Sequence, residues 1–446
     1  MADPALTPLD VGRGLADPAT YDEVILRIFE KRRQRGQAYT EALSGVTYFD
    51  TATGRRSLSR ALARSVGEGD YHPQPVALWS LETGGKTRDA HESAFTDHVV
   101  GSALYQLLSR NARCYGLPGV YSYLPGISNN TAMRAFATFV RRHRTRVGAK
   151  GAPLYVLQSD FDHYGDGLPV GPDAPVWPIL REVASLGSPD GALPDRHWTL
   201  ICELARPVVR DSEGALFTRR YGVAMGTPLV PLLSNLAVTP MDRAIVDIDG
   251  MFYARYNDDF ILAHPDLTVM QQADARIDAL VGRLGVRRKG AKELRTALSA
   301  TGMPAPDDPA YSGRNRIDCL GLSVSHAGAM AVGPHRLRRL MHRLSTRIDF
   351  AARSVATLTA TDRAQHLVTA TNVMLDVGSP FCLPGLSALL DATTDRGVLA
   401  DLDFRVARKI VQSATGCRGV LGFRVIAPRI LHEMGLVSLV KLRNLR

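Results

Sequence analysis

Acidic residues end or interrupt two apolar segments of the chain, as they do at many metal sites. Asp160 follows the apolar residues of the run LYVLQS, and Asp258 and Asp259 interrupt the apolar segment 251–263. A carboxylate is costly to hold near a core without a counter-charge, and Mg²⁺ supplies one through the oxygen ligands that it prefers. Two metals held by such carboxylates carry out in-line phosphoryl transfer. The residues alone therefore favour two-metal nucleotidyl transfer, with acids in solvated loops as the alternative.

Strands and a turn would have to position these acids. Residues 154–161 are expected to form a strand that runs into Asp160. Residues 251–263 are expected to form a strand–turn–strand hairpin, because Asn and Asp tolerate turn conformations. A further strand is expected over 317–324, and 162–200 are expected to be mostly loop with one short helix. Apolar periodicity predicts helices over the following ranges: 20–45, 57–66, 89–110, 129–147, 229–247, 267–285 and from about 334 to the end. This order indicates a mixed α/β domain with helical arms.

Composition bounds the class of protein. The chain has 446 residues, of which 45% are hydrophobic and 22% charged, and this excludes wholesale disorder. It contains no apolar run of ~18 residues and no secretory signal pattern, so a cytoplasmic protein without membrane contact is expected. Five dispersed cysteines form no metal-binding spacing. The net charge of +10 favours a polyanionic partner.

Five segments occur in an order that resembles a known family. They are the strand ending at Asp160, then YGVAMGTPLVPLLSNL (221–236), RYNDDFILA (255–263), LGVRRKGAKE (284–293) and IDCLGLSV (317–324). The series is similar to the palm motifs of reverse transcriptases in the branch of group II intron, retron and bacterial defence-associated enzymes. Residues 86–109 and 121–133 resemble the finger motifs of that branch. The resemblance spans about residues 70–330.

The resemblance implies roles for residues at the acidic site. Asp160 and Asp258 match the main ligands of two Mg²⁺ ions, with Mn²⁺ as an alternative, and Asp259 matches a less direct contributor. The backbone carbonyl of Phe161 would be a further metal ligand. Lys292 matches a lysine that protonates pyrophosphate, although a plain surface lysine is an equal alternative.

The resemblance also implies contacts to substrates. Lys86 and Arg88 match finger cations that hold the incoming triphosphate, a role suited to an ammonium and a guanidinium. Four more residues would contact the nucleotide: Tyr164, Gly165, Met225 and Gly226. A third group would contact nucleic acid: Gly222, Thr227, Asn235, Arg336, Arg339, Arg343 and Arg347. An exposed basic loop or a solvated amphipathic helix is the simpler alternative for the cationic members.

Three departures from the family pattern concern the nucleotide pocket. Ala224-Met225-Gly226 stands where relatives have Pro-Gln-Gly, and Leu124 stands where they have an arginine. An aromatic residue that excludes ribonucleotides normally lies five residues after the first catalytic Asp, whereas this chain has Gly165 there. We expect Tyr164 to serve as that aromatic gate.

The resemblance implies an α/β (α+β) right-hand polymerase fold. A helical extension (1–66) would precede fingers (67–150), an RRM-like palm (151–330, with a loop-rich insertion at about 165–200) and a helical thumb with a C-terminal extension (331–446). The implied function is an RNA-directed DNA polymerase that uses an RNA template, such as a dedicated noncoding RNA, and dNTPs to make DNA. Antiviral defence is the expected biology. Untemplated or protein-primed synthesis, a retron enzyme, and a homo-oligomer or partner protein stay open.

Overall fold

The computed structural model describes residues 6–83, 85–148, 151–305 and 308–445. The chain is a mixed α/β protein that divides into two compact units. The first unit comprises Met1–Asn129 and Val156–Leu294, and the second comprises Asn130–Tyr155 and Arg295–Arg446. Within the described ranges, no helix is both long and apolar enough to cross a bilayer.

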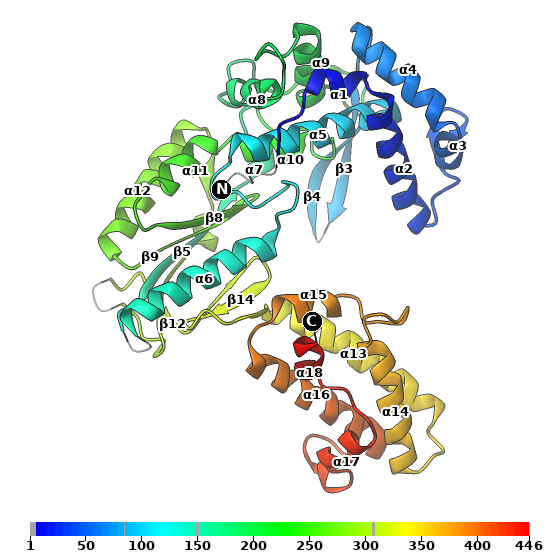
Figure 1. Cartoon of the computed structure of the whole chain (residues 1–446), viewed down its shortest axis with the longest axis vertical. Coiled ribbons are helices and arrows are strands. Elements are labelled where there is room, and N and C mark those ends of the chain that lie inside the picture. Colours follow the sequence, from blue (N-terminus) through cyan, green and yellow to red (C-terminus); the bar gives the residue numbers. More distant parts are fainter. Residues whose placement is uncertain (1–5, 84, 149–150, 306–307, 446) are drawn as a thin grey trace. The chain divides into compact units, whose positions relative to one another are not determined.

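The first unit contains the sheet that carries the acidic residues. Its strands β5 (Leu154–Asp162), β9 (Asp259–His264) and β8 (Phe252–Tyr256) lie side by side in that order, and β10 (Arg287–Arg288) pairs antiparallel with the end of β5. Helices α11 (Thr239–Val246) and α12 (Leu267–Arg283) pack on β8 and β9 (Figure 1). Asp266 caps the N-terminus of α12, where its carboxylate accepts from the Thr268 and Val269 N–H groups. Its buried residues recur at helical spacing: Met270, Ala273, Ile277 and Val281.

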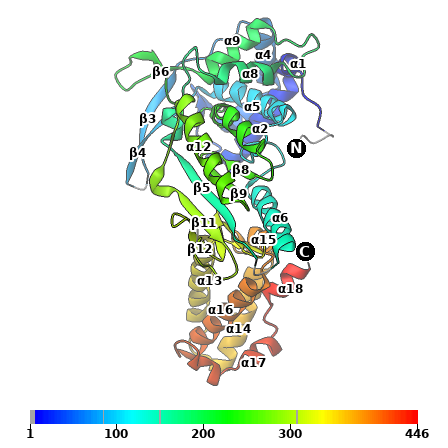
Figure 2. The same cartoon turned by 90° about the vertical axis from the view of Figure 1, so that its left-hand side faces the viewer.

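A second sheet of this unit was not expected from the sequence. Strands β3 (Val76–Thr83) and β4 (Lys86–Glu92) form a long hairpin, and β6 (Val208–Arg210) and β7 (Leu216–Thr218) extend it (Figure 2). Residues 89–92, expected to begin a helix, are therefore strand, and α5 covers Phe95–Tyr115. The error arose because many side chains of the hairpin are exposed, so the hairpin has no apolar periodicity.

The remaining helices of the first unit lie mainly at its N-terminus and between β5 and β8. They are α1 (Val11–Ala16), α2 (Pro18–Gln34), α3 (Tyr48–Thr53), α4 (Arg55–Glu68), α7 (Tyr164–Gly167), α8 (Val176–Ser185), α9 (Asp195–Ala205) and α10 (Val230–Leu236). The expected helix over 20–45 ends early, because Gly36 adopts a left-handed conformation (φ 72°) and β1 (Glu41–Leu43) and β2 (Val46–Thr47) follow. The region 162–200, expected to be mostly loop with one short helix, contains α7, α8 and the start of α9.

The second unit combines a small sheet with a helical bundle. The expected strand 317–324 is a hairpin of β13 (Arg316–Cys319) and β14 (Leu322–Ser325), extended by β15 (Met330–Val332), and β11 (Leu294–Leu298) pairs with β12 (Ser312–Arg314). Helices α13 (Pro334–Ser354), α14 (Ala360–Leu375) and α16 (Arg396–Thr415) pack on one another. The other helices are α6 (Asn129–Val147), as expected, α15 (Leu386–Ala392), α17 (Pro428–Glu433) and α18 (Leu439–Asn444).

Candidate active site

Two of the three expected acids meet in the first unit. Asp160 lies near the end of β5 with 3% of its surface exposed, and Asp258 lies in the turn between β8 and β9. The Phe161 N–H donates to the Asp258 carbonyl at 3.2 Å, which places the turn beside the end of β5. The two carboxyl groups are within hydrogen-bonding reach of each other. The expected hairpin with its acids at the tip is therefore confirmed.

Their proximity changes how Asp258 ionises. Burial raises the pKa of Asp258, and the charge of Asp160 raises it further, while a hydrogen bond from the Asn257 side chain at 2.9 Å acts in the opposite direction. Two adjoining carboxyls, one buried and one half-buried, favour a cation that neutralises both. The pair therefore fits an oxygen-ligated divalent ion.

The expected ligand set is assembled only in part. Asp259 is exposed at the first position of β9. Among the described residues, no group of three or more His, Cys, Asp or Glu side chains is placed to hold a metal ion. The Phe161 ring is buried and stacks on Tyr164 at 4.9 Å between ring centroids. Asp160 and Asp258 are thus the carboxylates that the fold brings together.

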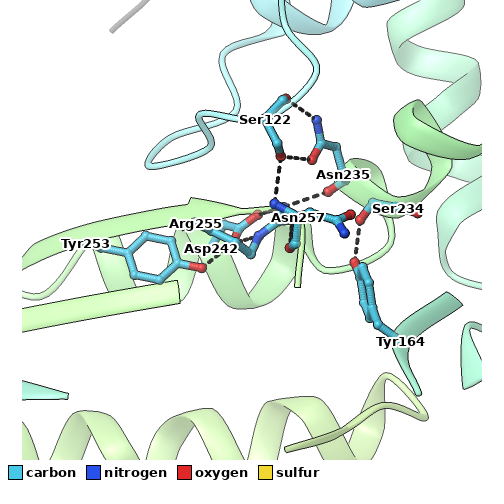
Figure 3. Close-up of polar contacts among 8 residues, drawn as sticks. All are labelled: Ser122, Tyr164, Ser234, Asn235, Asp242, Tyr253, Arg255 and Asn257. Atoms are coloured by element: carbon cyan, nitrogen blue, oxygen red, sulfur yellow. Dashed lines mark hydrogen bonds and ion pairs between the residues drawn. The ribbon is translucent and has the colours of Figure 1, made fainter. Parts of the chain in front are cut away.

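A cluster of polar side chains hydrogen-bonds to the turn directly before Asp258 (Figure 3), and we call it the turn network. Its members are Ser122, Asn235, Asp242, Tyr253, Arg255 and Asn257. The Arg255 guanidinium pairs with Asp242 at 2.7 Å, and both side chains are fully buried. It also donates to the backbone carbonyls of Asn257 at 3.0 Å and Asn235 at 2.9 Å. One charged group therefore joins α10, α11 and the turn before Asp258.

The other half of the turn network comes from a loop after α5. The Ser122 hydroxyl donates to the Asn235 side-chain oxygen at 2.8 Å and accepts from the Asn257 N–H at 2.9 Å, while the Asn235 amide donates to the Ser122 carbonyl at 2.7 Å (Figure 3). Asn257 needs this support because it adopts a left-handed conformation with φ 60°. The contacts fix the backbone directly before Asp258.

The turn network also corrects one expectation and adds residues that the sequence analysis missed. Asn235 was expected to contact nucleic acid, but its side chain is fully buried in the network. Asp242 and Arg255 were not singled out. An arginine two residues before the turn, inside an otherwise apolar strand, was the available signal, since a charge there requires a buried partner.

The loop expected to approach the nucleotide packs against β4. The His91 N–H donates to the Met225 carbonyl at 2.7 Å. Gly226 has φ 109°, and a Cβ there would lie 2.6 Å from the His91 carbonyl oxygen, so no side chain fits. Gly222 is also left-handed and buried, and Thr227 is 6% exposed. The buried position of Thr227 therefore does not support the expected contact of its side chain with nucleic acid. Met225 is 41% exposed, so its side chain is accessible to a nucleotide.

Tyr164 is not placed to act as an aromatic gate. Its side chain is buried, and its hydroxyl donates to the Ser234 carbonyl (Figure 3). Burial raises its pKa. The expectation that Tyr164 contacts the nucleotide is wrong, because its ring is buried in the protein core and stacks on Phe161. Gly165 instead faces Met225, whose sulfur would lie 3.0 Å from a Cβ at position 165.

Of the cations expected to act on phosphates at the site, the structure describes the side chain of Arg88 alone. Arg88 is exposed on β4, opposite Leu81 of β3. The side chains of Lys86 and Lys292 lie outside the described part of the chain, and their expected roles stay predictions.

Four arginines follow one exposed face of α13 in the second unit, and we call them the arginine face: Arg336, Arg339, Arg343 and Arg347. Arg347 donates to the Phe381 carbonyl at 3.1 Å. Arg343 makes a long contact, 3.5 Å, to the Pro384 carbonyl. Leu340, Leu344 and Ile348 are buried on an adjacent face, so the amphipathic pattern is confirmed. Contact with nucleic acid stays a prediction.

Comparison with known proteins identifies similar solved structures but no family. No family model matches the sequence, and no curated protein matches it. The chain is similar to telomerase from Candida albicans in complex with the TWJ fragment of telomeric RNA, at 13% identity and a TM-score of 0.45 over 82% of this chain and 67% of that one. It is also similar to telomerase from Candida tropicalis with the TWJ fragment, at 13% identity and a TM-score of 0.45 over 88% and 68%. The apo form of the latter gives 10% identity and a TM-score of 0.45 over 81% and 67%. These telomerases are what the chain is similar to, and the identities and TM-scores are too low to assign it to a family.

Proposed function

We propose that this chain is an RNA-directed DNA polymerase that joins dNTPs by two-metal nucleotidyl transfer. The observation that carries the proposal is the meeting of Asp160 and Asp258 at the end of β5. Their positions in an ordered series of reverse-transcriptase-like motifs support it.

In this proposal Asp160 and Asp258 would hold two Mg²⁺ ions, and the ions would supply activation of the primer 3′-hydroxyl and stabilisation of the leaving pyrophosphate. The turn network keeps Asp258 beside Asp160. Lys86 and Arg88 bind the triphosphate of the incoming nucleotide, and Lys292 gives a proton to pyrophosphate. Met225 with Gly165 and Gly226 borders the nucleotide. The arginine face binds phosphates of the template–product duplex.

Replacing Asp258 by Asn tests the chemistry. Because metal ions supply several kcal/mol of transition-state stabilisation, incorporation of labelled dNTP with Mg²⁺ should fall on the order of 10³-fold. Asp249→Asn, at an exposed carboxylate before β8, is the matched control and should keep wild-type activity. Incorporation by Asp258→Asn above a few per cent of wild type would contradict the proposal.

Thermal melting shows whether the Asp258→Asn variant keeps its fold. Folding raises the pKa of Asp258, so the folded protein binds this proton more tightly than the unfolded chain does. The stability that the bound proton provides is lost as the pH rises through the raised pKa. Without divalent ions at pH 7.5, Asp258→Asn should melt at the wild-type temperature or above it. A lower melting temperature would mean that the carboxylate is structural.

We also propose that the enzyme acts in antiviral defence, because its sequence departs from intron-mobility relatives at the nucleotide pocket. Sequencing the nucleic acid that copurifies with the protein would identify the template and the product. Incorporation that needs an added RNA template supports reverse transcription. Product without any template, or product attached to protein, would instead support the untemplated or protein-primed alternative.

A further inference from the structure

Tyr123 occupies an unusual backbone conformation close to the candidate active site. Its φ of 57° lies in the left-handed region, which bulky residues rarely adopt. Such conformations persist where the surrounding structure enforces them, and they are common at binding sites.

The residues around Tyr123 enforce this conformation. Ser122 is fully buried in the turn network, and Leu124 is 6% exposed. The Tyr105 hydroxyl donates to the Tyr123 carbonyl at 2.8 Å. With both neighbours fixed and its own carbonyl held, the left-handed backbone sets the direction of the Tyr123 side chain.

The ring of Tyr123 lies beside the turn that carries Asp258. Its centroid is 6.2 Å from that of Tyr256, with 37° between the ring planes. The neighbouring Ser122 hydroxyl accepts from the Asn257 N–H at 2.9 Å, which holds this segment against the turn directly before Asp258. Yet 39% of Tyr123 is exposed. Tyr123 is thus an exposed aromatic residue outside the core, and its ring lies beside Tyr256, two residues before the metal-ligand candidate Asp258.

We propose that Tyr123 is a binding residue that packs its ring against a nucleobase or sugar positioned at Asp258. This inference rests on the proposed function, since that function places a nucleotide at Asp258. Aromatic rings suit this contact because every base has a π-face, so stacking tolerates any sequence. The nucleotide could come from the 3′ end of the primer or from the incoming dNTP, and the experiment separates the two.

Two variants remove the ring and keep the backbone conformation. Gly and Asn both tolerate positive φ, so Tyr123→Gly and Tyr123→Asn should fold and melt near the wild-type temperature. Tyr123→Phe keeps the ring and loses the hydroxyl. Tyr39→Asn removes another exposed tyrosine (75%) and serves as the control.

The measurements are the affinity for an RNA template–DNA primer duplex in EDTA, the fluorescence of 2-aminopurine at the primer 3′ end, and KM for dNTP. If the ring contacts the primer, the Gly and Asn variants bind the duplex about tenfold more weakly, as loss of a base–aromatic stack does, and change the 2-aminopurine signal. If it contacts the incoming nucleotide, the KM for dNTP rises by about the same factor. Tyr123→Phe and Tyr39→Asn should change neither.

Wild-type duplex affinity, fluorescence and KM in both ring-less variants would overturn the inference. That result is distinct from failure of the proposed function, in which the wild-type protein itself incorporates no nucleotide. The duplex affinity and fluorescence in EDTA do not depend on catalysis, and neither does equilibrium binding of dNTP to the duplex complex in Ca²⁺. These three measurements therefore still report on Tyr123 in that case, and unchanged values in all three would again overturn the inference.

Discussion

The turn network and the arginine face place arginine side chains in opposite environments, one buried and one exposed to solvent. In the turn network, the Arg255 charge is buried, paired with Asp242 and hydrogen-bonded to two backbone carbonyls. In the arginine face, all four arginines are exposed, and Arg343 and Arg347 contact backbone carbonyls of the loop before α15. Buried charges depend strongly on each partner, whereas exposed charges are screened and act additively. Single substitutions should therefore be severe in the first region and mild in the second.

Asp242→Ala should have the largest effect on stability. It leaves the Arg255 guanidinium buried without its counter-charge, which costs about 3–5 kcal/mol. Urea unfolding of the metal-free protein would measure this loss. A destabilisation below about 1 kcal/mol would mean that the pair is more hydrated than its burial indicates.

The double variant Asp242→Leu with Arg255→Met separates stability from positioning. Apolar replacements of a buried ion pair are often neutral or stabilising, so much of the lost stability should return. Incorporation activity should stay low, because the Asn257 and Asn235 carbonyls have then lost the guanidinium that joins them. Full activity in a stable double variant would show that Asp258 needs no support from Arg255.

Tyr164→Phe should have an intermediate effect, on stability alone. The variant keeps the buried ring but leaves the Ser234 carbonyl without this donor, and an unsatisfied buried acceptor costs about 1–3 kcal/mol. Parallel assays with dNTP and rNTP should give the wild-type preference in this variant. Met225→Ala is the matched comparison, because Met225 is the exposed side chain that faces Gly165. Because Phe keeps the aromatic ring, Tyr164→Leu tests the gate itself, and a change of sugar preference in Tyr164→Leu without one in Met225→Ala would return the gate to Tyr164.

Substitutions in the arginine face should have the smallest individual effects. Each phosphate contact contributes about one unit to the slope of log affinity against log salt. Arg339→Gln with Arg343→Gln should therefore flatten the slope for an RNA–DNA duplex by about two units, while the melting temperature stays unchanged. An unchanged slope would mean that this face of α13 does not bind the duplex.

The sequence predicted the parts of the site that depend on local patterns. The apolar runs before Asp160 and around Asp258 predicted the strands, and Asn257-Asp258 predicted their turn. The contacts of Ser122 in the turn network could not be predicted in this way, because they join residues more than a hundred positions apart, such as Ser122 and Asn235. The burial of Tyr164 was missed for the same reason, since its partner Ser234 lies on a helix 70 positions further along.

The segment before Tyr123 has a consequence for how the chain behaves at high concentration. β8 is the last strand on its side of the sheet, and exposed edge strands can pair with other molecules and start aggregation. Here the Arg255 N–H donates to the Gly119 carbonyl at 2.7 Å, and the Tyr121 N–H donates to the Arg255 carbonyl at 2.8 Å. Residues 119–121 thus cover the edge of β8. A Cβ at position 119 would lie 2.3 Å from the Tyr253 ring, so a side chain there would push this segment away from the strand. The glycine thus protects the folded chain against edge-to-edge association at the strand that leads to Asp258.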